Sequence, residues 1–487
     1  MNCAAQSLEI ARNALRDAAL SARDPNAAIE FATMYGRVNW RNNDGLLSDE
    51  DFEISLLENH RRHLVGSAAS GGWCVDWLHV VSEVYDAGGH TQLLERLALE
   101  LLRRGASQRI VVTRHMSLAF SERARAAGLD HIELAGDHVA RCRQIISLGR
   151  QARVVVLHLH PDDMGAAWAA RILLAEGITV LFVNHADHSF LFGTGAATAV
   201  LEVSGFGWVL SHAHRPIVKH GYLGIPVARP STRHVYRGQR SGHRILSIGN
   251  SRKYIPGVGH SFSHLLGALL PRTSVGVEVI GPDRNAQHWA SLIKRFPGRL
   301  HLPGVLPYEV VEQRYAQALC YVDSMPVTGG TVFSQALMAG LPVFGLAENG
   351  GGYGLTDALR FEQLDDLVSS VLTYLETGIE PPEQNEVRTR LVEYSSVQAV
   401  TDRLERAASG SLVRPTRDLL RFGMGLDYYT RAWKERGFAL IPLAPAGAVT
   451  VSSRMQLFAS VLRGRCSIII PWNPAKRLRW LLSGHWS

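Results

Sequence analysis

The chain has 487 residues, 46% of them hydrophobic and 20% charged, with a net charge of +7. This length exceeds what one ordinary core can fill, so we expect two or three domains. The composition excludes a largely disordered chain. No apolar run approaches the ~20 residues of a membrane-spanning helix, and no nucleic-acid-binding motif accompanies the positive charge, so nucleic acid is not an expected partner.

Two features predict the cellular compartment of the protein. The N-terminus is charged where a cleaved signal peptide would need an apolar stretch, because it carries Glu9, Arg12, Arg16 and Asp17. The five cysteines are widely spaced and include no CxxC pair, a pattern typical of reduced thiols. Together these features indicate a cytoplasmic protein.

The first region, residues 1–72, is predicted to be a helical and peripheral extension. Leu8, Ala11, Leu15 and Ala19 recur at helical spacing. Residues 49–64 are typical of a second helix.

A different pattern begins near Trp77, where short apolar runs alternate with amphipathic segments. The predicted strands cover 77–84, 109–115, 154–160, 178–187 and 207–213, and the predicted helices cover 93–105 and 163–176. Apolar strands that alternate with helices indicate a parallel sheet covered on both faces. We therefore expect a Rossmann-like domain over residues 73–235.

The segment 226–243 interrupts this alternation, because it is rich in Pro, Arg, Gly and Ser, and we interpret it as a linker. A second alternating set follows, with strands at 244–250, 275–281, 299–304, 319–324 and 341–346, intervening helices, and two closing helices at 361–377 and 386–408. The predicted fold is thus α/β, with two tandem doubly wound domains, the second over 236–410. Ligands bind at the carboxyl ends of the strands of such sheets, which places a site in the cleft between the domains.

The most informative segment is 318–346, in which an apolar strand ends at Asp323 and a turn-rich loop follows. Gly329 and Gly330 allow a ligand to approach the backbone closely, and the next helix begins beside them. The unpaired N–H groups of a helix start form a suitable site for a phosphate or diphosphate. The segment therefore predicts a phosphorylated ligand.

The stretch VDSMPVTGGTVFSQALMAGLPVFGL resembles the donor loop of GT-B-fold glycosyltransferases, in particular the O-GlcNAc-transferase-like and group 1 families. The likeness extends over roughly 75–410. It implies a nucleotide-diphosphate sugar as donor substrate, with no cofactor, and a donor-binding role for the loop residues Thr328, Gly329, Gly330 and Thr331.

Two further loops resemble parts of the same enzymes. SIGNSRKYIPG is similar to the stretch that brings a basic residue to the donor diphosphate, which implies this role for Arg252 and Lys253. VYDAGGHTQLLE is similar to the glycine-rich loop that faces the transferred sugar and the acceptor, which implies roles for Gly88, Gly89 and Thr91.

One position departs from the resemblance. Retaining members carry a Glu on the helix after the donor loop, where it holds the ribose hydroxyls, and the O-GlcNAc-transferase-like members carry an Asp. This chain has Gln335, whose amide bonds hydroxyls without charge. We expect Gln335 to contact the donor, but the departure weakly disfavours the retaining group.

The candidate catalytic base is a histidine of the first domain. His185 and Asp187 follow a predicted buried strand, and imidazole titrates near neutral pH. His185 is predicted either to deprotonate the acceptor hydroxyl, with Asp187 orienting it or acting in its place, or to bond loop backbone; His90 is the competing base. His158 and His160 suggest a metal site, but no acidic pair at a known spacing follows, so no metal is expected.

The predicted function is metal-independent transfer of a hexosyl or N-acetylhexosaminyl group to an acceptor hydroxyl on a glycan, a lipid-linked molecule or a protein. Two alternatives remain open. A GT-B-fold nucleotide-sugar epimerase would need carboxylates around the sugar, and a non-catalytic partner subunit of another transferase would keep only the fold.

The last region, 411–487, is predicted to be a basic extension. After Arg436 it contains no acidic side chain, and it includes Trp472, Trp480 and Trp486. Such a segment can contact the anionic inner face of a membrane. The favoured alternative is an Arg-rich tail that packs on the body of the protein or stays loose.

Overall fold

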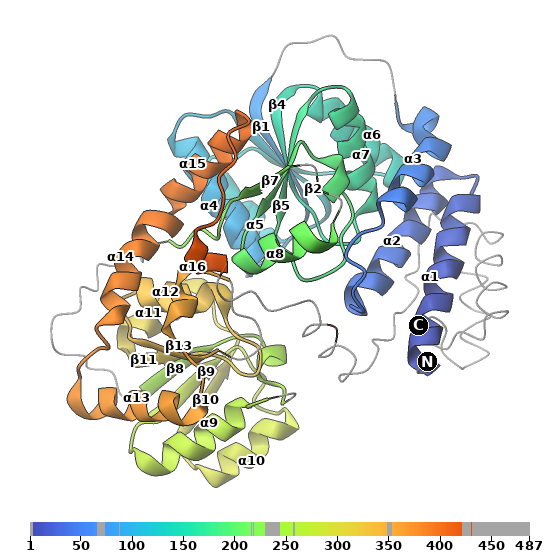
Figure 1. The fold of residues 1–487 in the computed structure, drawn as a ribbon. Coiled ribbons are helices and arrows are strands. Elements are labelled where there is room, and N and C mark those ends of the chain that lie inside the picture. Colours follow the sequence, from blue (N-terminus) through green and yellow to red (C-terminus); the bar gives the residue numbers. More distant parts are fainter. Residues whose placement is uncertain are drawn as a thin grey trace.

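The structure is a computed structural model, and it describes residues 3–65, 74–86, 88–215, 217, 219–228, 244–256, 259–347, 353–420 and 430. Its elements form two α/β units, each with a central parallel sheet, and the carboxyl edges of the two sheets face the same interdomain region (Figure 1). Most of the basic C-terminal region and most of the predicted linker lie outside the described residues. Within the described residues, no helix has the length and apolar character needed to cross a bilayer.

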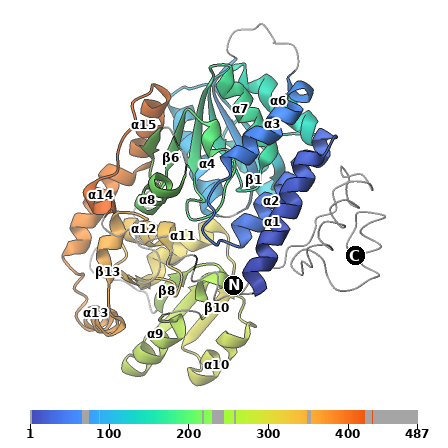
Figure 2. The same cartoon turned by 45° about the vertical axis from the view of Figure 1, so that its right-hand side comes forward.

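Three helices precede the first sheet: α1 (Cys3–Ser21), α2 (Pro25–Arg41) and α3 (Glu50–Leu64). The helical character predicted for this region is confirmed, although α2 was not predicted. Asp24 caps α2 by accepting hydrogen bonds from the N–H groups of Asn26 and Ala27, and Pro25 occupies its first turn. The buried faces of α1, α2 and α3 share one apolar core with the first sheet, beside α6 and α7 (Figure 2).

The first sheet has seven parallel strands in the order β3-β2-β1-β4-β5-β6-β7. Their bounds in chain order are β1 (Val75–Val84), β2 (Gln108–Met116), β3 (His131–Glu133), β4 (Ala152–His158), β5 (Thr179–Asn184), β6 (Ala199–Glu202) and β7 (His220–Tyr222). The central strands are almost entirely buried, because helices cover both faces.

The connecting elements of this unit are α4 (Gly89–Arg103), α5 (Leu118–Ala126), α6 (His138–Gly149), α7 (Met164–Ala175), η1 (Thr194–Ala196) and α8 (Gly205–His214). The strand predicted at 207–213 is wrong, because this segment is helix α8. Ser204 caps it by accepting from the N–H of Gly207, and Phe206 and Leu210 are buried one turn apart. A short apolar run fits a strand or a helix equally well, and here the capping residue Ser204 favours the helix.

The second sheet has six parallel strands in the order β10-β9-β8-β11-β12-β13. The strands are β8 (Arg244–Ile248), β9 (Gly276–Ile280), β10 (Leu300–Gly304), β11 (Ala318–Val322), β12 (Val343–Leu346) and β13 (Arg360–Phe361). The helices are η2 (Ser251–Tyr254), α9 (Phe262–Leu269), η3 (Leu270–Arg272), α10 (Gln287–Arg295), α11 (Tyr308–Gln317), α12 (Gly330–Met338), η4 (Leu355–Leu359), α13 (Leu364–Thr377), α14 (Glu383–Ser395), α15 (Val397–Ala408) and α16 (Arg417–Leu420). Both doubly wound sheets predicted from the sequence are confirmed.

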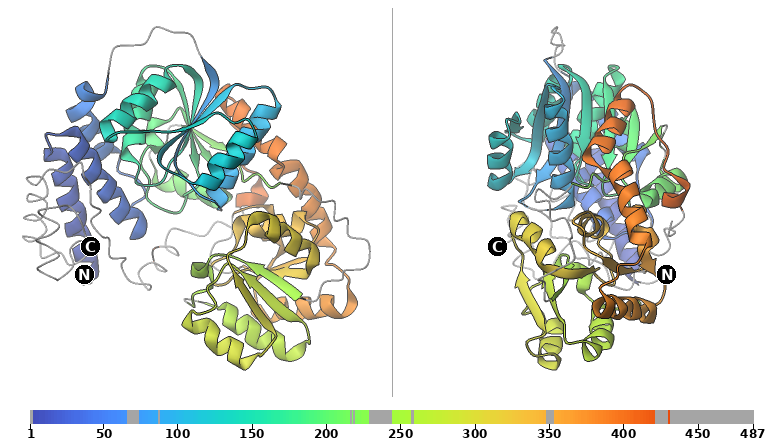
Figure 3. Two further views of the ribbon diagram at one scale, coloured as in Figure 1. Left: turned by 180° about the vertical axis from the view of Figure 1, so that it is seen from behind. Right: turned by 90° about the vertical axis from the view of Figure 1, so that its left-hand side faces the viewer.

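One correction concerns the last long helices, which were predicted as a single helix at 386–408 within the second domain. The chain forms α14 and then α15, and α15 returns to the first unit (Figure 3). Val400, Leu404 and Ala407 of α15 pack in one core with residues of β4, β5 and α4. Arg104 also pairs with Glu405 at 2.6 Å. The chain therefore crosses between the two units a second time.

Candidate functional site

Each sheet has one point where the strand order reverses, and the candidate site lies where these two points face each other. In the first sheet the reversal lies between β1 and β4, and in the second between β8 and β11. The loops after neighbouring strands diverge there, which opens a crevice at their carboxyl ends. The loop that starts α4 follows β1, and the loop that starts α12 follows β11.

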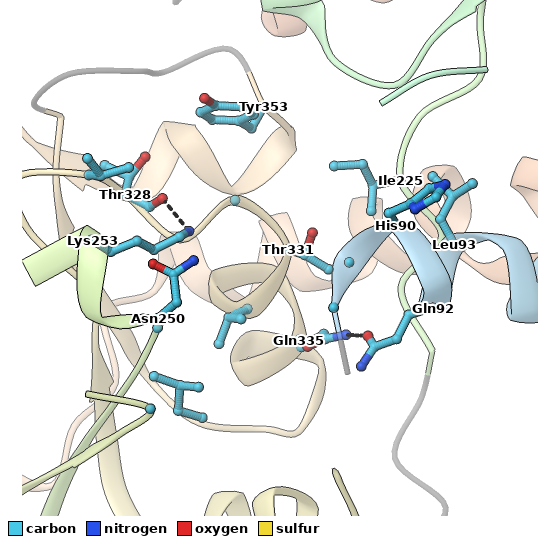
Figure 4. A pocket seen from close by; sticks show the side chains of 18 of the residues that line it. His90, Gln92, Leu93, Ile225, Asn250, Lys253, Thr328, Thr331, Gln335 and Tyr353 are labelled. Carbon is cyan, nitrogen blue, oxygen red and sulfur yellow. Dashed lines mark hydrogen bonds between the residues drawn. The ribbon is translucent and has the colours of Figure 1, made fainter. Parts of the chain in front are cut away.

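A cavity of about 740 Å³ lies between the two units and is lined by both. Ten of the residues predicted from the sequence line it: Gly88, Gly89, His90, His185, Asp187, Lys253, Thr328, Gly330, Thr331 and Gln335. Figure 4 shows Lys253 and Thr328 on one side of this cavity and His90 and Leu93 on the other, with Thr331 between them. A Cβ added to Gly89 would lie 3.7 Å from Thr331 Oγ1, so the starts of α4 and α12 approach each other closely.

The other three predicted residues lie around the cavity rather than on its wall. Thr91 is buried, and its hydroxyl accepts a hydrogen bond of 3.0 Å from the N–H of Tyr85, which closes the loop before α4. Gly329 is the N-cap residue of α12, and its N–H is bonded to Asp323. Arg252 is exposed in η2.

The loop before α12 is held by a buried carboxylate. Gly329 N donates to both oxygens of Asp323, at 3.1 and 3.0 Å, and Ser324 N donates to Oδ1 at 2.9 Å. Arg360 Nη1 donates to Asp323 Oδ2 at 2.8 Å, which pairs the buried charge. A Cβ on Gly329 would lie 2.6 Å from Asp323 Oδ1, so this backbone approach requires a glycine. The sequence indicated the loop but not the role of Asp323 in holding it.

Lys253 brings a cation to the same loop. Its Nζ donates a hydrogen bond of 2.8 Å to the carbonyl oxygen of Thr328 (Figure 4). Burial lowers the pKa of Lys253, the nearby Asp323 charge opposes that effect, and the Arg360 charge adds to it. The ammonium therefore lies beside the N-terminus of α12, where both the cation and the helix dipole favour an anion.

On the opposite wall, His90 and His185 stack. Their ring centroids lie 4.0 Å apart and the ring planes differ by 16°. Burial lowers the pKa of His90 to about 4, and burial together with the neighbouring histidines lowers the pKa of His185 well below its ordinary value. Both imidazoles are therefore neutral at pH 7. Within the described residues, His90 Nε2 and His185 Nδ1 are buried and have no hydrogen-bond partner.

Two more histidines extend this cluster into the sheet. His79 Nδ1 and His158 Nε2 lie 3.2 Å apart and share a hydrogen bond, and the rings of His158 and His90 are 6.5 Å apart. Burial lowers the pKa of His79 to about 4 and that of His158 well below its ordinary value. Within the described residues, no group of three or more His, Cys, Asp or Glu side chains is arranged to hold a metal ion.

Asp187 has partners other than His185. It is 3% exposed, its Oδ2 accepts from Ser204 Oγ, and its Oδ1 lies 3.1 Å from His188 Nδ1. It lines the cavity, but this structure shows it bound to Ser204 and His188 rather than orienting the imidazole of His185.

Gln335 faces the other unit. Its Nε2 lies 3.3 Å from Gln92 Oε1 (Figure 4), and with the amide turned, its oxygen lies 2.7 Å from Arg96 Nη2. Arg96 also donates to the carbonyl oxygen of Pro226 at 2.7 Å. Gln335 is therefore part of a polar contact between α12 and α4, at the wall of the cavity.

Sequence reasoning missed the apolar part of the cavity, most of which the second unit supplies. Its members from that unit include Ile248, Ile280, Val305, Leu306, Val311, Tyr315 and Tyr353. Most come from strand ends and helix starts where the sequence shows only ordinary core residues. The alternation of apolar and turn residues after β8, β9 and β10 is the one signal that could have indicated them.

No protein-family model matches the chain, and no curated protein is significantly similar in sequence. Solved structures are similar in fold. A glycosyltransferase from Rickettsia africae ESF-5 matches with a TM-score of 0.54 and 10% identity, over 70% of this chain and 99% of that one. Anabaena HepE in complex with UDP matches with a TM-score of 0.52 and 12% identity, over 69% and 100%. Pneumococcal O-GlcNAc transferase GtfA in complex with UDP and GlcNAc matches with a TM-score of 0.51 and 9% identity, over 69% and 99%.

These matches span 69–70% of this chain and 99–100% of the solved chains, and the chain thus adopts the GT-B fold of these glycosyltransferases. At such low identity the likeness defines the fold alone.

Proposed function

We propose that this protein is a glycosyltransferase that moves a sugar from a nucleotide-diphosphate donor to an acceptor hydroxyl in the cleft. The observation that carries the proposal is that two different sets of groups face each other across one cavity. A glycine-rich helix start with a half-buried ammonium lies on one wall, and two neutral imidazoles with unpartnered ring nitrogens lie on the other.

In this proposal the second unit binds the donor. The diphosphate would lie at the N–H groups of Gly330 and Thr331, with the Lys253 ammonium beside it, because both stabilise the negative charge that develops on the leaving group. We assign this cation role to Lys253 rather than Arg252, since Lys253 lines the cavity. The apolar wall around Ile248, Ile280 and Tyr315 would accommodate the nucleobase. UDP in the HepE and GtfA complexes supports a nucleotide donor.

In this proposal the first unit binds the acceptor and supplies the base. An acceptor hydroxyl would donate its proton to His185 or His90 as its oxygen bonds the anomeric carbon and the bond from that carbon to the diphosphate breaks. A base must be unprotonated to act, and burial keeps both imidazoles neutral. Gly88 and Gly89 leave room for the sugar between the two helix starts.

Two alternatives fit the site less well. An epimerase would need carboxylates around the sugar, whereas Asp187 is the one acid among the described residues that line the cavity, and it is held by Ser204. A non-catalytic partner subunit is favoured by a single observation, the engagement of Gln335 by Gln92 and Arg96 in place of a ribose-binding carboxylate.

Purified protein should be screened with UDP-, GDP- and dTDP-sugars by thermal shift, and then assayed for donor hydrolysis and transfer. A donor that binds only the folded state raises the unfolding temperature in proportion to ln(1 + [L]/Kd). Slow hydrolysis of that donor, faster with an acceptor present, supports the transferase. Binding without turnover would favour the partner subunit, and a changed donor sugar without an acceptor would favour the epimerase.

A further inference from the structure

An aromatic side chain just before η4 borders the helix start at which the diphosphate is proposed to bind. Tyr353 lines the cavity, and Figure 4 shows its ring on the side where Lys253 and Thr328 lie, across from His90. The near end of the ring packs on the first residue of α12, because a Cβ added to Gly330 would lie 3.3 Å from Tyr353 Cγ and 3.4 Å from its Cβ. The hydroxyl is at the far end of the ring and is not part of this contact.

A buried ion network holds Tyr353 in this place. Asp357 Oδ2 accepts a hydrogen bond of 2.7 Å from the N–H of Tyr353. Asp357 Oδ1 pairs with Arg360 Nε at 2.8 Å, and Arg360 Nη1 pairs with Asp323 Oδ2 at 2.8 Å. Asp323 also holds Gly329, so one guanidinium ties the Tyr353 backbone to the donor loop. Breaking a buried ion pair leaves an uncompensated charge, and this arrangement therefore resists change.

The first unit packs against the same side chain. The ring centroids of Tyr353 and Phe206 of α8 lie 6.4 Å apart, with the ring planes at 42°, and Phe206 is fully buried. The next residue, Gly207, packs on the loop of Asp187, since an added Cβ would lie 2.6 Å from Asp187 Cβ. Contacts from both units thus fix the Tyr353 ring. A side chain that is already fixed loses little conformational freedom when it binds a ligand.

We propose that Tyr353 is a donor-binding residue whose hydroxyl donates a hydrogen bond to the sugar-bearing phosphate, and that Asp357, paired with Arg360, positions it. The inference rests on the proposed glycosyl transfer and names a residue that selects nucleoside diphosphates over monophosphates. The sugar-bearing phosphate must face the first unit, where the acceptor is proposed to bind, and Tyr353 lies where the second unit contacts Phe206 of the first. A phenol hydroxyl bonds an anionic phosphate oxygen more strongly than a neutral group.

The test is calorimetric titration with the nucleoside diphosphate of the donor found by thermal shift, and with the corresponding monophosphate. Tyr353→Phe keeps the packing on Gly330 and Phe206 and removes only the hydroxyl. It should lower diphosphate affinity at least about tenfold, because a hydrogen bond to a charged group is lost, and monophosphate affinity less than about twofold. Tyr394→Phe removes a hydroxyl from α14 that does not line the cavity, and it should change neither affinity.

Unaltered diphosphate affinity in Tyr353→Phe would overturn the inference. Equal losses for diphosphate and monophosphate would also overturn it, because they would place the ring on the nucleoside. If the native protein binds neither a nucleotide sugar nor a nucleoside diphosphate, the proposed function is overturned instead.

A double-variant cycle tests the positioning role of Asp357. Asp357→Asn keeps the size of the side chain but removes the charge that holds the Tyr353 N–H, so it should lower diphosphate affinity about threefold or more. In the Tyr353→Phe background the same change should have less than about a twofold effect, since the hydroxyl that it positions is already absent. Equal losses in both backgrounds would show that Asp357 does not act through Tyr353. Thermal unfolding of each variant checks that it folds.

Discussion

The imidazole rings of His90 and His185 lie almost parallel, with centroids 4.0 Å apart, although one residue starts α4 and the other follows β5. Both are half-buried, both have a lowered pKa, and each has one buried ring nitrogen without a partner among the described residues. An unpartnered buried nitrogen is costly unless a ligand completes its hydrogen bonding. Under the proposed function, the pair is where we expect an acceptor hydroxyl to bind.

The first prediction concerns this pair. His185→Ala should reduce turnover by about 10²–10⁴-fold while nucleoside diphosphate affinity stays nearly unchanged, because the base acts on the acceptor and not on the donor. Steady-state transfer kinetics and calorimetric titration measure the two quantities. His301→Ala, on the outer edge of the second sheet, is the control. Full activity in His185→Ala with loss of activity in His90→Ala would assign the base to His90.

The second prediction concerns Lys253. Lys253→Met keeps most of the side-chain volume but removes the ammonium, and it should weaken nucleoside diphosphate binding by about 1.5–3 kcal/mol, the usual range for hydrogen bonds to charged groups. Lys294→Met, at an exposed position of α10, should not change the affinity. Arg252→Ala should lower nucleoside diphosphate affinity less than Lys253→Met does, since Arg252 does not line the cavity. Equal affinity in the native protein and Lys253→Met would show that the diphosphate binds elsewhere.

The third prediction concerns the glycine held by Asp323. A methyl group on Gly329 would lie 2.6 Å from Asp323 Oδ1, so Gly329→Ala should shift the loop and weaken diphosphate binding at least tenfold. Gly267→Ala, in α9, meets only the flexible end of Arg295 at 3.5 Å and serves as the control. Titration with a nucleoside diphosphate compares the two. Unaltered affinity in Gly329→Ala would mean that the backbone of this loop does not bind the phosphates.

The fourth prediction concerns Gln335. Gln335→Glu places a carboxylate beside Arg96, so it should strengthen the contact between α12 and α4 and raise the unfolding temperature. The double variant with Arg96→Ala should lose that gain, with a coupling energy of about 0.5–3 kcal/mol. Titration of Gln335→Glu with uridine, guanosine and thymidine diphosphates tests the alternative, in which the carboxylate binds ribose and tightens nucleotide affinity up to about tenfold.

The fifth prediction concerns pH. Burial lowers the pKa of His90 to about 4, so between pH 6.5 and 4 the unfolded chain binds a proton that the folded chain does not. The native protein should therefore lose stability as pH falls through this range, by about 1.4 kcal/mol per pH unit for each such histidine.

The control for the pH prediction is His90→Gln. Glu53, whose pKa burial raises to about 8, contributes with the opposite sign, so the informative quantity is the difference between native protein and variant. Urea unfolding at pH 7, 6, 5 and 4.5 should show the native protein becoming less stable relative to His90→Gln. A difference that does not depend on pH would contradict the burial of His90.

Much of the fold was predictable because local patterns decide it. Continuous apolar runs between amphipathic helices specified both parallel sheets, and the glycines after Asp323 specified a loop that starts a helix. The segment 207–213 was misread because its apolar run is too short to distinguish a strand from a helix. Helix α2 was missed, although Asp24 and Pro25 are typical of a helix start.

The sequence by itself thus determined the two doubly wound units and the loop at 326–331 that starts a helix, since strand burial, turn chemistry and helix starts depend on neighbouring residues. Only the tertiary structure decided which distant side chains meet. It stacked His90 on His185, turned Gln335 toward Arg96 and returned α15 to the first unit. These contacts depend on how two separately folded sheets and their crossing helices pack, and no local pattern in the chain encodes that relative placement.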